Sequence, residues 1–522
     1  MTRRLGDAIR GVVVIALTAT LTAAIPAEAA PARPPTLTWT TCPPDPNGAP
    51  VDPRLRCTTL RVPMDYRAPA GRTIEIAVSR LATAKPGLRR GILLHNAGGP
   101  GAASLNRPST SVGLYPRDVL DRFDLIGFDP RGLGYSTPIT CGRTAQITNE
   151  RLFPFPAPDG SIADNVDFAR ELARDCLANG GALLPHVTTA NTARDMDRIR
   201  IALGERKLSY LSASYGSYLG AVYAELFPDR TDRIVLDANV DPNVTWHERW
   251  ASWDHGFDTR FGDFAAWAAE RHDTLGLGAT PAAVRRGYLD MVERLDRSPV
   301  QHPGAGLVTG NLFRAIYQAY SYHTLQFPEV AAWWRFLAGT GPPPQWGEWP
   351  STPGIPRDND TAVLLAVTCG DSRAPRDIAH YRREVTVNRA LFPILGGMGT
   401  NIWPCAFWPD PVEPAVRITD RGTTDILLLQ TTRDPATPYP GALSMRSALG
   451  KRARMITVDG GNHGAYDPEA PSCAVTRAHD FLSTGALPAR DLFCFHDPAP
   501  AQDGNRLPYA TLHANRPRIG PF

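Results

Sequence analysis

The chain of 522 residues is 43% hydrophobic and 20% charged, with a formal net charge of +3. This composition is typical of a soluble globular protein, and so small a net charge argues against a nucleic acid or an acidic surface as its partner. The length exceeds one simple core, so we expect either a domain that carries a large insertion or two domains.

The N-terminus has the pattern of an export signal. Three arginines within the first ten residues precede an apolar run, 11–25, that is too short to span a bilayer comfortably. Ala27-Glu28-Ala29 then offers a cleavage site, so residues 1–29 are predicted to be a signal peptide. The residues around the paired arginines match a twin-arginine signal poorly. No cysteine follows closely and no later segment is long and apolar enough to cross a membrane, so we predict a secreted protein without a stable membrane anchor.

Eight cysteines fit that destination, because an even number in an exported chain indicates disulfides. Free buried thiols are the alternative, and they are less expected outside the cytoplasm. No C-x-x-C spacing indicates zinc, and we expect neither a metal nor a cofactor. The cysteines fall into four pairs of neighbours in the sequence, which predicts these bridges: Cys42–Cys57, Cys141–Cys176, Cys369–Cys405 and Cys473–Cys494.

The first strands of the mature chain lead to a glycine-rich turn. Two strands are predicted at 58–64 and 73–81, and a third, 91–95, continues directly into NAGGPG at 96–101. Glycines after a strand let backbone N–H groups approach a ligand closely. A plain glycine turn is the alternative, and phosphate binding is a poorer one because neither G-x-G-x-x-G nor a Walker lysine is present.

The next segments alternate between strand and helix. A strand at 123–128 ends in DPRGLGYS, a helix is expected at 192–203, and short strands are expected at 208–211 and 233–237. This alternation predicts a mostly parallel sheet that is covered on both faces.

Ser214 lies in a turn between the strand at 208–211 and an apolar helical pattern. Strand, sharp turn and helix with a serine at the apex form a nucleophile elbow, whose usual motif is G-x-S-x-G. Gly216 supplies the second glycine, and Ser212 replaces the first with another small residue. The alternative is an ordinary turn that contains several serines.

Residues 242–405 differ from the rest in composition, because they hold eight of the eleven tryptophans. Their pattern is helical, with a Gly/Pro-rich break near 339–344. An aromatic, helical insertion between strands resembles a lid over an apolar pocket, and these rings also suit the core of a second domain. The eight are Trp246, Trp250, Trp253, Trp267, Trp333, Trp334, Trp346 and Trp349.

Alternation of strand and turn then resumes. A strand at 425–430 is followed by Asp434, and a strand at 454–458 is followed by His463. A serine, an acid and a histidine in this chain order, each just past a strand, predict an α/β-hydrolase fold with a mostly parallel, doubly wound sheet and an inserted helical lid. In this chemistry the histidine takes the proton of Ser214, and the aspartate orients the ring and stabilises its charged form.

The expected domain order follows from these segments: signal peptide 1–29, the first half of the core 30–241, the lid 242–405, and the second half of the core 406–522. The natural oxyanion donors are the N–H groups of the glycine turn, acting with the N–H of Tyr215.

Other residues are weaker candidates for the acid and the base. Asp425 begins its strand, at the wrong end for the site, and Asp459 stands too near His463 in the sequence to reach its ring readily. His95 precedes the glycine turn, where a histidine is more often structural. Ser214 excludes the branches of this fold that use an aspartate nucleophile.

Six stretches together resemble the secreted tripeptidyl aminopeptidase family of actinobacteria, which is related to proline iminopeptidases and has a TAP-like C-terminal region. This resemblance implies that Ser214, Asp434 and His463 are the triad and that Gly99 with Tyr215 forms the oxyanion pair. The family has glycine at position 212, and some members cleave esters better than peptides. The stretches are TLRVPMDY (59–66), NAGGPG (96–101), FDLIGFDPRGLGYS (123–136), SASYGSYLGAVYAELFP (212–228), LLLQTTRDPATPY (427–439) and GGNHGAY (460–466).

The function expected from this resemblance is the release of short peptides, most of them tripeptides, from a free N-terminus. A secreted carboxylesterase with the same triad and a non-catalytic binding protein are the alternatives. An acidic group that binds the substrate's amine would favour the peptidase; Asp371 is one candidate, although an ordinary capping role suits it as well. The sequence does not reveal the preferred side chains or the oligomeric state.

Overall fold

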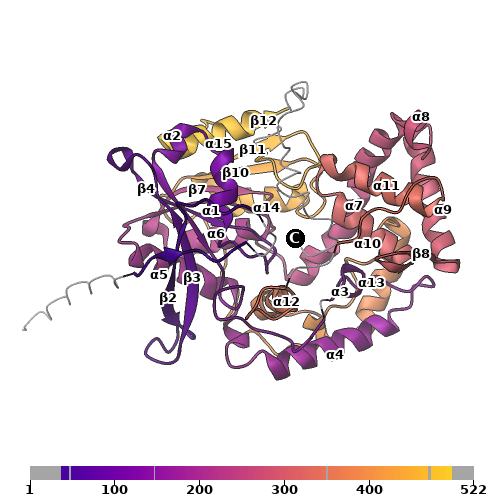
Figure 1. The fold of residues 1–522 in the computed structure, drawn as a ribbon, viewed down its shortest axis with the longest axis horizontal. Helices are drawn as coiled ribbons and strands as arrows, with labels where there is room; N and C mark the ends of the chain where they lie inside the picture. Colours follow the sequence, from indigo (N-terminus) through magenta and orange to yellow (C-terminus); the bar gives the residue numbers. More distant parts are fainter. Residues whose placement is uncertain (1–36, 46–48, 146, 348–350, 468–471, 496–522) are drawn as a thin grey trace, which may run out of the picture. The chain divides into compact units, whose positions relative to one another are not determined.

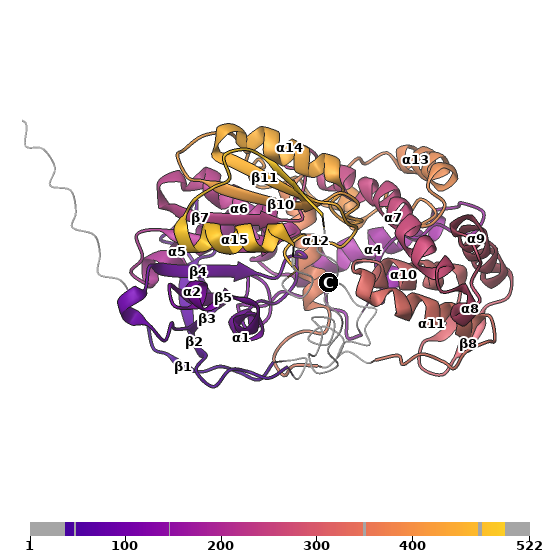
Figure 2. The same cartoon turned by 90° about the horizontal axis from the view of Figure 1, so that it is seen from above.

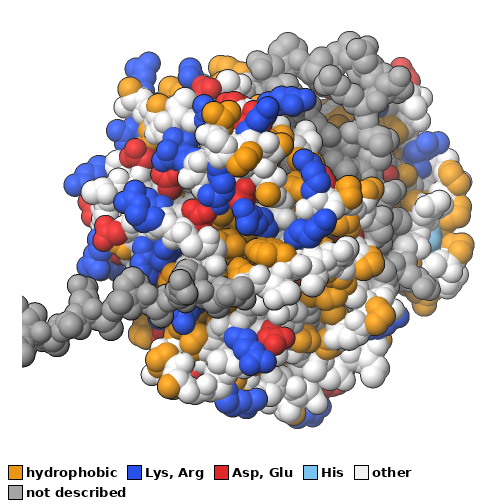
Figure 3. Space-filling model, turned by 60° about the vertical axis from the view of Figure 1, so that its left-hand side comes forward, with side chains coloured by type: hydrophobic (Ala, Val, Ile, Leu, Met, Phe, Trp, Pro, Cys, Tyr) orange, Lys and Arg blue, Asp and Glu red, His pale blue; other side chains and the backbone are white. Residues whose placement is uncertain are grey.

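The computed structural model describes residues 37–45, 49–145, 147–347, 351–467 and 472–495, and these described residues belong to one compact unit. The predicted signal peptide, 1–29, lies outside the described residues. In the described ranges no helix is long and apolar enough to cross a membrane. On the face shown in Figure 3, basic and acidic side chains are interspersed.

A ten-stranded sheet forms the centre of the fold (Figure 1), in the order β1-β2-β3-β5-β4-β6-β7-β10-β11-β12. The pairs β1–β2, β2–β3 and β3–β5 are antiparallel, and the pairs from β5 through β4 to β12 are parallel. The strands are β1 (Thr40–Thr41), β2 (Arg56–Pro63), β3 (Thr73–Leu81), β4 (Gly91–Asn96), β5 (Phe123–Phe128), β6 (Leu208–Ala213), β7 (Thr231–Asp237), β10 (Ile426–Thr431), β11 (Ala453–Val458) and β12 (Leu492–Cys494).

Helices cover both faces of the sheet, as parallel strands require. All six residues of β4 are buried, and its successive side chains Leu93 and Leu94 belong to different hydrophobic clusters. In Figure 2, α14 and α15 lie on opposite sides of β10 and β11. The helices of one face are α5 (Thr189–Ala202), α6 (Tyr215–Leu226) and α14 (Tyr439–Leu449), and those of the other are α1 (Arg107–Ser111), α2 (Arg117–Leu120) and α15 (Cys473–Thr484).

Helix α5 begins at Thr189, three residues before the expected start. The side chain of Thr188 caps it by accepting the N–H of Asn191. An N-cap threonine satisfies one of the N–H groups that the first helical turn leaves unpaired, so the helix starts there.

The segment between β7 and β10 is mainly helical, as expected, and also contains a small antiparallel hairpin that the sequence pattern did not indicate. Most of its tryptophans are buried and pack with each other or with phenylalanines and tyrosines, so they form the core of this insertion. Its elements are α7 (Trp246–Ala269), α8 (His272–Leu275), α9 (Pro281–Arg297), β8 (Val300–His302), β9 (Gly306–Val308), α10 (Gly310–Tyr320), α11 (Phe327–Leu337), α12 (Asn359–Asp371) and α13 (Ile378–Leu391).

Two helices that precede β6 in the sequence also pack on this insertion (Figure 1). Helix α3 (Asn149–Leu152) contacts α10, and α4 (Ala163–Asn179) contacts the 3-10 turn η6 (Pro404–Phe407). The remaining 3-10 turns are η1 (Pro86–Leu88), η2 (Val112–Leu114), η3 (Leu184–His186), η4 (Pro228–Arg230), η5 (Thr324–Gln326) and η7 (Gly450–Arg452).

Four disulfides join the cysteines in the pairs predicted from the sequence, and no cysteine is left free. Cys369–Cys405 links α12 to η6, and Cys473–Cys494 links α15 to β12. The first of these two bridges joins elements that also pack as neighbours.

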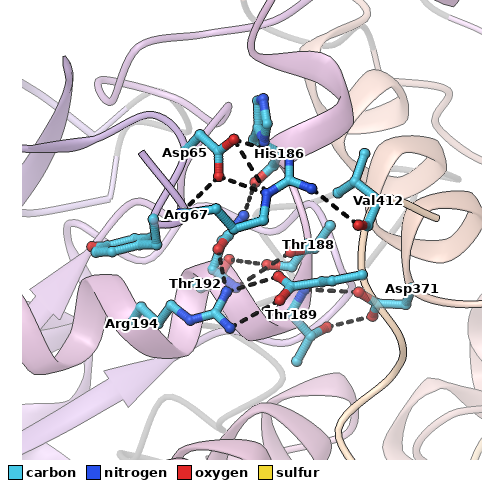
Figure 4. A network of polar contacts seen from close by, with 12 residues as sticks. Asp65, Arg67, His186, Thr188, Thr189, Thr192, Arg194, Asp371 and Val412 are labelled. Atoms are coloured by element: carbon cyan, nitrogen blue, oxygen red, sulfur yellow. Dashed lines mark hydrogen bonds and ion pairs between the residues drawn. The ribbon is translucent and has the colours of Figure 1, made fainter. Parts of the chain in front are cut away.

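Polar contacts tie the insertion and the C-terminal half to the start of α5 (Figure 4). Asp371, the last residue of α12, accepts the backbone N–H of Thr189 at 2.9 Å and its hydroxyl at 2.6 Å. Nearby, Arg67 donates to the carbonyl of Val412 at 3.1 Å. The end of α12 therefore meets the start of α5, and Val412 meets the turn between β2 and β3.

Candidate active site

Ser214 stands between β6 and α6 in a strained backbone conformation. Its φ is 60° and its ψ is −132°, which a residue with a side chain rarely adopts. Its N–H donates to the carbonyl of Asp237 at 3.1 Å, and its carbonyl accepts the hydroxyl of Ser217 at 2.6 Å. Strain of this kind persists where the surrounding structure fixes it, and it is common at functional sites.

Ser212 occupies the first glycine position of the elbow because its side chain has room and a partner there. Its hydroxyl donates to the carbonyl of Asn96 at 2.6 Å. The room comes from Gly216, since a Cβ on this glycine would lie 1.7 Å from Oγ of Ser212. The departure from the usual motif therefore depends on glycine at 216.

Asp434 and His463 form a direct pair beside this turn. Nδ1 of His463 lies 2.8 Å from Oδ1 and 3.0 Å from Oδ2 of the buried aspartate. Oδ1 also accepts the backbone N–H groups of Ala436 and Thr437, at 2.9 and 2.8 Å. Because a carboxylate accepts, Nδ1 carries the proton, and Nε2 of the neutral ring is left with its lone pair.

A residue of the insertion also contacts His463, and two nearby carboxylates change the pKa of its ring. Its backbone N–H donates to the carbonyl of Tyr322 at 2.7 Å, and the two rings meet edge to face with centroids 5.2 Å apart. Burial lowers the pKa of His463, but the charges of Asp434 and Asp237 outweigh it and raise the pKa above its ordinary value of 6.5. Both carboxylates therefore favour an imidazolium at this position.

No hydrogen bond joins Ser214 to His463 in this structure, and Nε2 of the histidine has no partner among the described residues. Hydrogen bonds of this kind often tighten only when substrate is bound. The unpaired Nε2 is therefore free to accept a proton.

Asp237, which the sequence did not single out, supports the loop that carries His463. Its carboxylate accepts the N–H groups of Ala465 at 2.8 Å and Tyr466 at 3.0 Å, and that of Ala238 at 2.8 Å. Burial raises its pKa to about 6 despite these donors, and the nearby Asp434 adds to the rise. Its place at the carboxyl end of a parallel strand, as for Asp434, was the signal that could have identified it.

The backbone N–H groups of Gly99 and Tyr215, near Ser214, have no acceptor among the described residues. Tyr215 is the first residue of α6, where the N–H is unpaired within the helix and the dipole favours negative charge. Gly99 has a φ of 101°, and a Cβ on it would meet the nitrogen of Gly101 at 2.8 Å. The N–H of Gly98 is already bonded to Oδ1 of Asn96.

A pocket of about 320 Å³ is lined by Ser214, Gly99 and Tyr215. The buried rings of Trp246, Trp250 and Trp253 form one wall of it. The loop after Asp434 forms another part of the lining, with Ala436, Thr437, Pro438, Pro440 and Gly441. The exposed side chains of Glu248 and His255, the half-buried Asp241 and the largely buried Arg249 also line it.

The weaker candidates have other partners. Asp425 is exposed at the start of its strand, and Asp459 pairs with Arg433 at 2.6 Å. His95 is buried beside Tyr115, and burial lowers its pKa to about 3. Asp371 does not line the pocket; its carboxylate bonds to Thr189 and to Nε1 of Trp246, so it serves the packing of α12.

Comparison with known proteins gives matches over most of the chain. Residues 396–494, which include Asp434 and His463, match a family described as TAP-like protein. A tripeptidyl aminopeptidase of Streptomyces coelicolor is 34% identical over 458 residues, covering 84% of this chain and 83% of that protein. The serine protease Hip1 of Mycobacterium tuberculosis is 30% identical over 467 residues, covering 84% and 87%. Carboxylesterase B of the same species is 32% identical over 460 residues, covering 84% and 86%.

The chain belongs to the tripeptidyl aminopeptidase family. The resemblance inferred from six short stretches is thereby confirmed, as is the α/β-hydrolase fold. The protein is a serine hydrolase, and its relatives support a serine peptidase.

Proposed function

We propose that the protein is an exported serine exopeptidase that releases tripeptides from free N-termini. Ser214 is the nucleophile, His463 the general base and Asp434 the residue that orients it. The observation that carries this proposal is the Asp434–His463 pair beside a strained serine, in a chain related to proteins named tripeptidyl aminopeptidase.

In this mechanism Oγ of Ser214 attacks the carbonyl carbon of the third residue while Nε2 of His463 takes its proton. The N–H groups of Gly99 and Tyr215 stabilise the negative charge that develops on the carbonyl oxygen. The imidazolium then protonates the leaving amine, and the tripeptide remains as an ester on Ser214. Water, deprotonated by His463, hydrolyses that ester and restores the serine.

Selection of a free N-terminus requires a carboxylate near the bound ammonium, since an unpaired charge in a cleft is costly. Asp241 and Glu248 line the pocket that begins at Ser214, and neither forms an ion pair with another described residue. Helix α7 of the insertion lines this pocket, and in this proposal the pocket's depth limits how many residues precede the scissile bond. These two carboxylates support the peptidase function over the esterase.

Export is the second part of the proposal. Four disulfides are typical of proteins that leave the cytoplasm. N-terminal sequencing of the protein from the culture medium is expected to begin at residue 30, after Ala29. An intact N-terminus, or protein retained inside the cell, would contradict this part of the proposal.

A carboxylesterase remains the second candidate, because the pocket is largely apolar and carboxylesterase B is 32% identical. Comparing kcat/KM for a tripeptide anilide, its N-acetylated form and a short-chain nitrophenyl ester separates the two. For a peptidase, kcat/KM is expected to fall by at least about 100-fold when the tripeptide is acetylated, because the acetyl group removes the charge that the carboxylates bind. Equal cleavage of the acetylated peptide, or turnover of the ester alone, would establish the esterase.

The carboxylates themselves can be tested by Asp241→Asn and Glu248→Gln. Their combination is expected to raise KM for the free tripeptide and to reduce the effect of acetylation. Glu270→Gln is the matched control, because Glu270 is an exposed acid that does not line the pocket. A free-versus-acetylated ratio that the double variant leaves unchanged would place the ammonium elsewhere.

A further inference from the structure

The three tryptophans of the pocket come from one face of α7. Trp246, Trp250 and Trp253 follow one another at spacings of four and three residues, so their side chains lie on one side of the helix. Each is only 4% exposed. The rings of Trp250 and Trp253 meet edge to face with centroids 4.6 Å apart.

This wall is fixed to the nucleophile turn and to the loop of the acid. The ring centroid of Trp246 lies 6.1 Å from that of Tyr215, the residue after Ser214. Nε1 of Trp246 is bonded to Asp371, and Nε1 of Trp253 donates to the carbonyl of Ala436 at 2.8 Å. The indole N–H groups of these two rings are therefore occupied, and they offer mainly their apolar surfaces to a ligand.

The position of His463 decides which part of a substrate this pocket can hold. The leaving group must take a proton from Nε2 of His463, so it lies on the histidine's side of Ser214. His463 does not line the pocket, whereas Ser214, Gly99 and Tyr215 do. The pocket thus lies on the acyl side of the scissile bond.

We propose that this pocket binds the side chain of the residue whose carbonyl is attacked, and that it selects a large apolar or aromatic side chain there. The proposal rests on the nucleophile assigned above to Ser214. A phenylalanine side chain gains from burial against three rings, whereas an aspartate side chain would lose its hydration in a lining that already contains the carboxylates of Asp241 and Glu248.

The experiment uses two sets of substrates that vary only the acyl residue next to the scissile bond. One set is tripeptide anilides with alanine, leucine, phenylalanine or aspartate at that position, and the other is nitrophenyl esters of the corresponding N-acetyl amino acids. The expected kcat/KM for phenylalanine exceeds that for alanine by about 10- to 100-fold, with aspartate the poorest. A preference for alanine or aspartate over phenylalanine in both sets would overturn the proposal.

A variant localises the preference to this pocket. Val244 lines it just before α7, and Val244→Trp is expected to lower the phenylalanine-to-alanine ratio by at least about tenfold by filling the space. Val387→Trp is the matched control, because Val387 is 53% exposed on α13, away from the pocket. An unchanged ratio in Val244→Trp would contradict the proposal.

The two substrate sets keep this proposal separate from the proposed function. If only the esters are cleaved, with the same preference for phenylalanine, the pocket assignment stands and the exopeptidase is wrong. If the tripeptides are cleaved without that preference, the exopeptidase stands and the pocket assignment is wrong. The wild-type ratios decide the pocket assignment even if Val244→Trp does not fold.

Discussion

At the scale of single residues, the environment of Ser214 differs from that of the other serines near it. Ser212 and Ser217 use their hydroxyls in hydrogen bonds to backbone carbonyls, at 2.6 Å in each case. Ser214 has the strained backbone, and it lines the pocket. The turn thus contains two structural serines and one that is available for chemistry.

Replacing Ser214 by alanine is therefore expected to lower kcat by roughly 10⁴-fold or more while the protein still folds. The reason is that no other described hydroxyl occupies the apex of the turn beside the two free N–H groups. Steady-state kinetics and labelling with a fluorophosphonate check this. Ser217→Ala is the control, since it removes a hydroxyl that supports the turn but should leave labelling at position 214. Labelling of another residue in the wild type would contradict the assignment.

Asp237 gives a second prediction at the scale of single residues, and it concerns the loop that carries His463. In Asp237→Asn an amide N–H₂ replaces one of the oxygens that accept the N–H groups of Ala465 and Tyr466, so the loop of His463 shifts. We expect kcat/KM at pH 8 to fall by about 10- to 100-fold, because small misplacements of catalytic groups have effects of this size. The measurement is kcat/KM as a function of pH for both proteins.

The pH profile distinguishes this role from simple destabilisation. In the wild type, activity should fall as the pH drops through the raised pKa of His463, and more steeply below about pH 6, where Asp237 takes up a proton. The asparagine variant lacks the second proton and the charge that raises the pKa of His463. The acid limb of the variant's pH–activity profile is therefore expected to move to lower pH and to become less steep. A limb of unchanged position and slope would exclude the role of Asp237 in placing His463.

At the scale of elements, the sequence predicted the strands of the sheet well. The spans of β3 and β5 agree with the structure, because buried strands appear as apolar runs that turn residues bound. The strands β1 and β12 were not predicted, since two and three residues carry too little pattern. Helix α5 began earlier than expected because its cap, Thr188, precedes the apolar repeat.

The elbow gives a prediction about how two positions of one turn depend on each other. Gly216→Ala is expected to abolish nearly all activity, because its Cβ would lie 1.7 Å from Oγ and 2.7 Å from Cβ of Ser212. Ser212→Gly alone should be tolerated, and the double variant should recover much of the activity. The nearest remaining contact of the new Cβ is then Oδ1 of Asn96 at 3.3 Å, which a small shift relieves.

Activity and thermal unfolding of the three variants form a double-mutant cycle for this pair. Additive effects would show that the clash between the two side chains does not limit the turn. A large favourable coupling is the expected result, and it would explain why serine is accepted at 212 in this chain.

At the scale of the whole molecule, most contacts between distant segments could not be predicted from the sequence pattern. The triad candidates could be predicted because each follows a strand, and parallel strands place their carboxyl ends at one edge. The sequence also predicted an aromatic lid over an apolar pocket, but it did not predict the full lining, since the wall combines α7 with the loop at 436–441 and the turn at Ser214. The packing of α4 on η6 could not be predicted either, because no pattern in one segment indicates that the other is its neighbour.

Asp371 joins the insertion to the sheet domain, which gives a prediction for the stability of the whole protein. Its buried carboxylate accepts three donors: the N–H and hydroxyl of Thr189 and Nε1 of Trp246. Asp371→Ala leaves the N–H of Thr189 and Nε1 of Trp246 without an acceptor, so we expect the free energy of unfolding to fall by about 3 kcal/mol. Urea denaturation followed by circular dichroism measures it.

Arg67→Ala is the control within the same network (Figure 4). Arg67 is more than half exposed, and its pair with Asp65 lies near the surface, so its loss should lower the free energy of unfolding far less than the loss of Asp371 does. The hydroxyl of Thr189 lies 3.0 Å from that of Tyr215, and Trp246 borders the pocket, so Asp371→Ala should also raise KM. Equal stability losses in the two variants, or an unchanged KM in Asp371→Ala, would mean that the end of α12 does not hold the pocket in place.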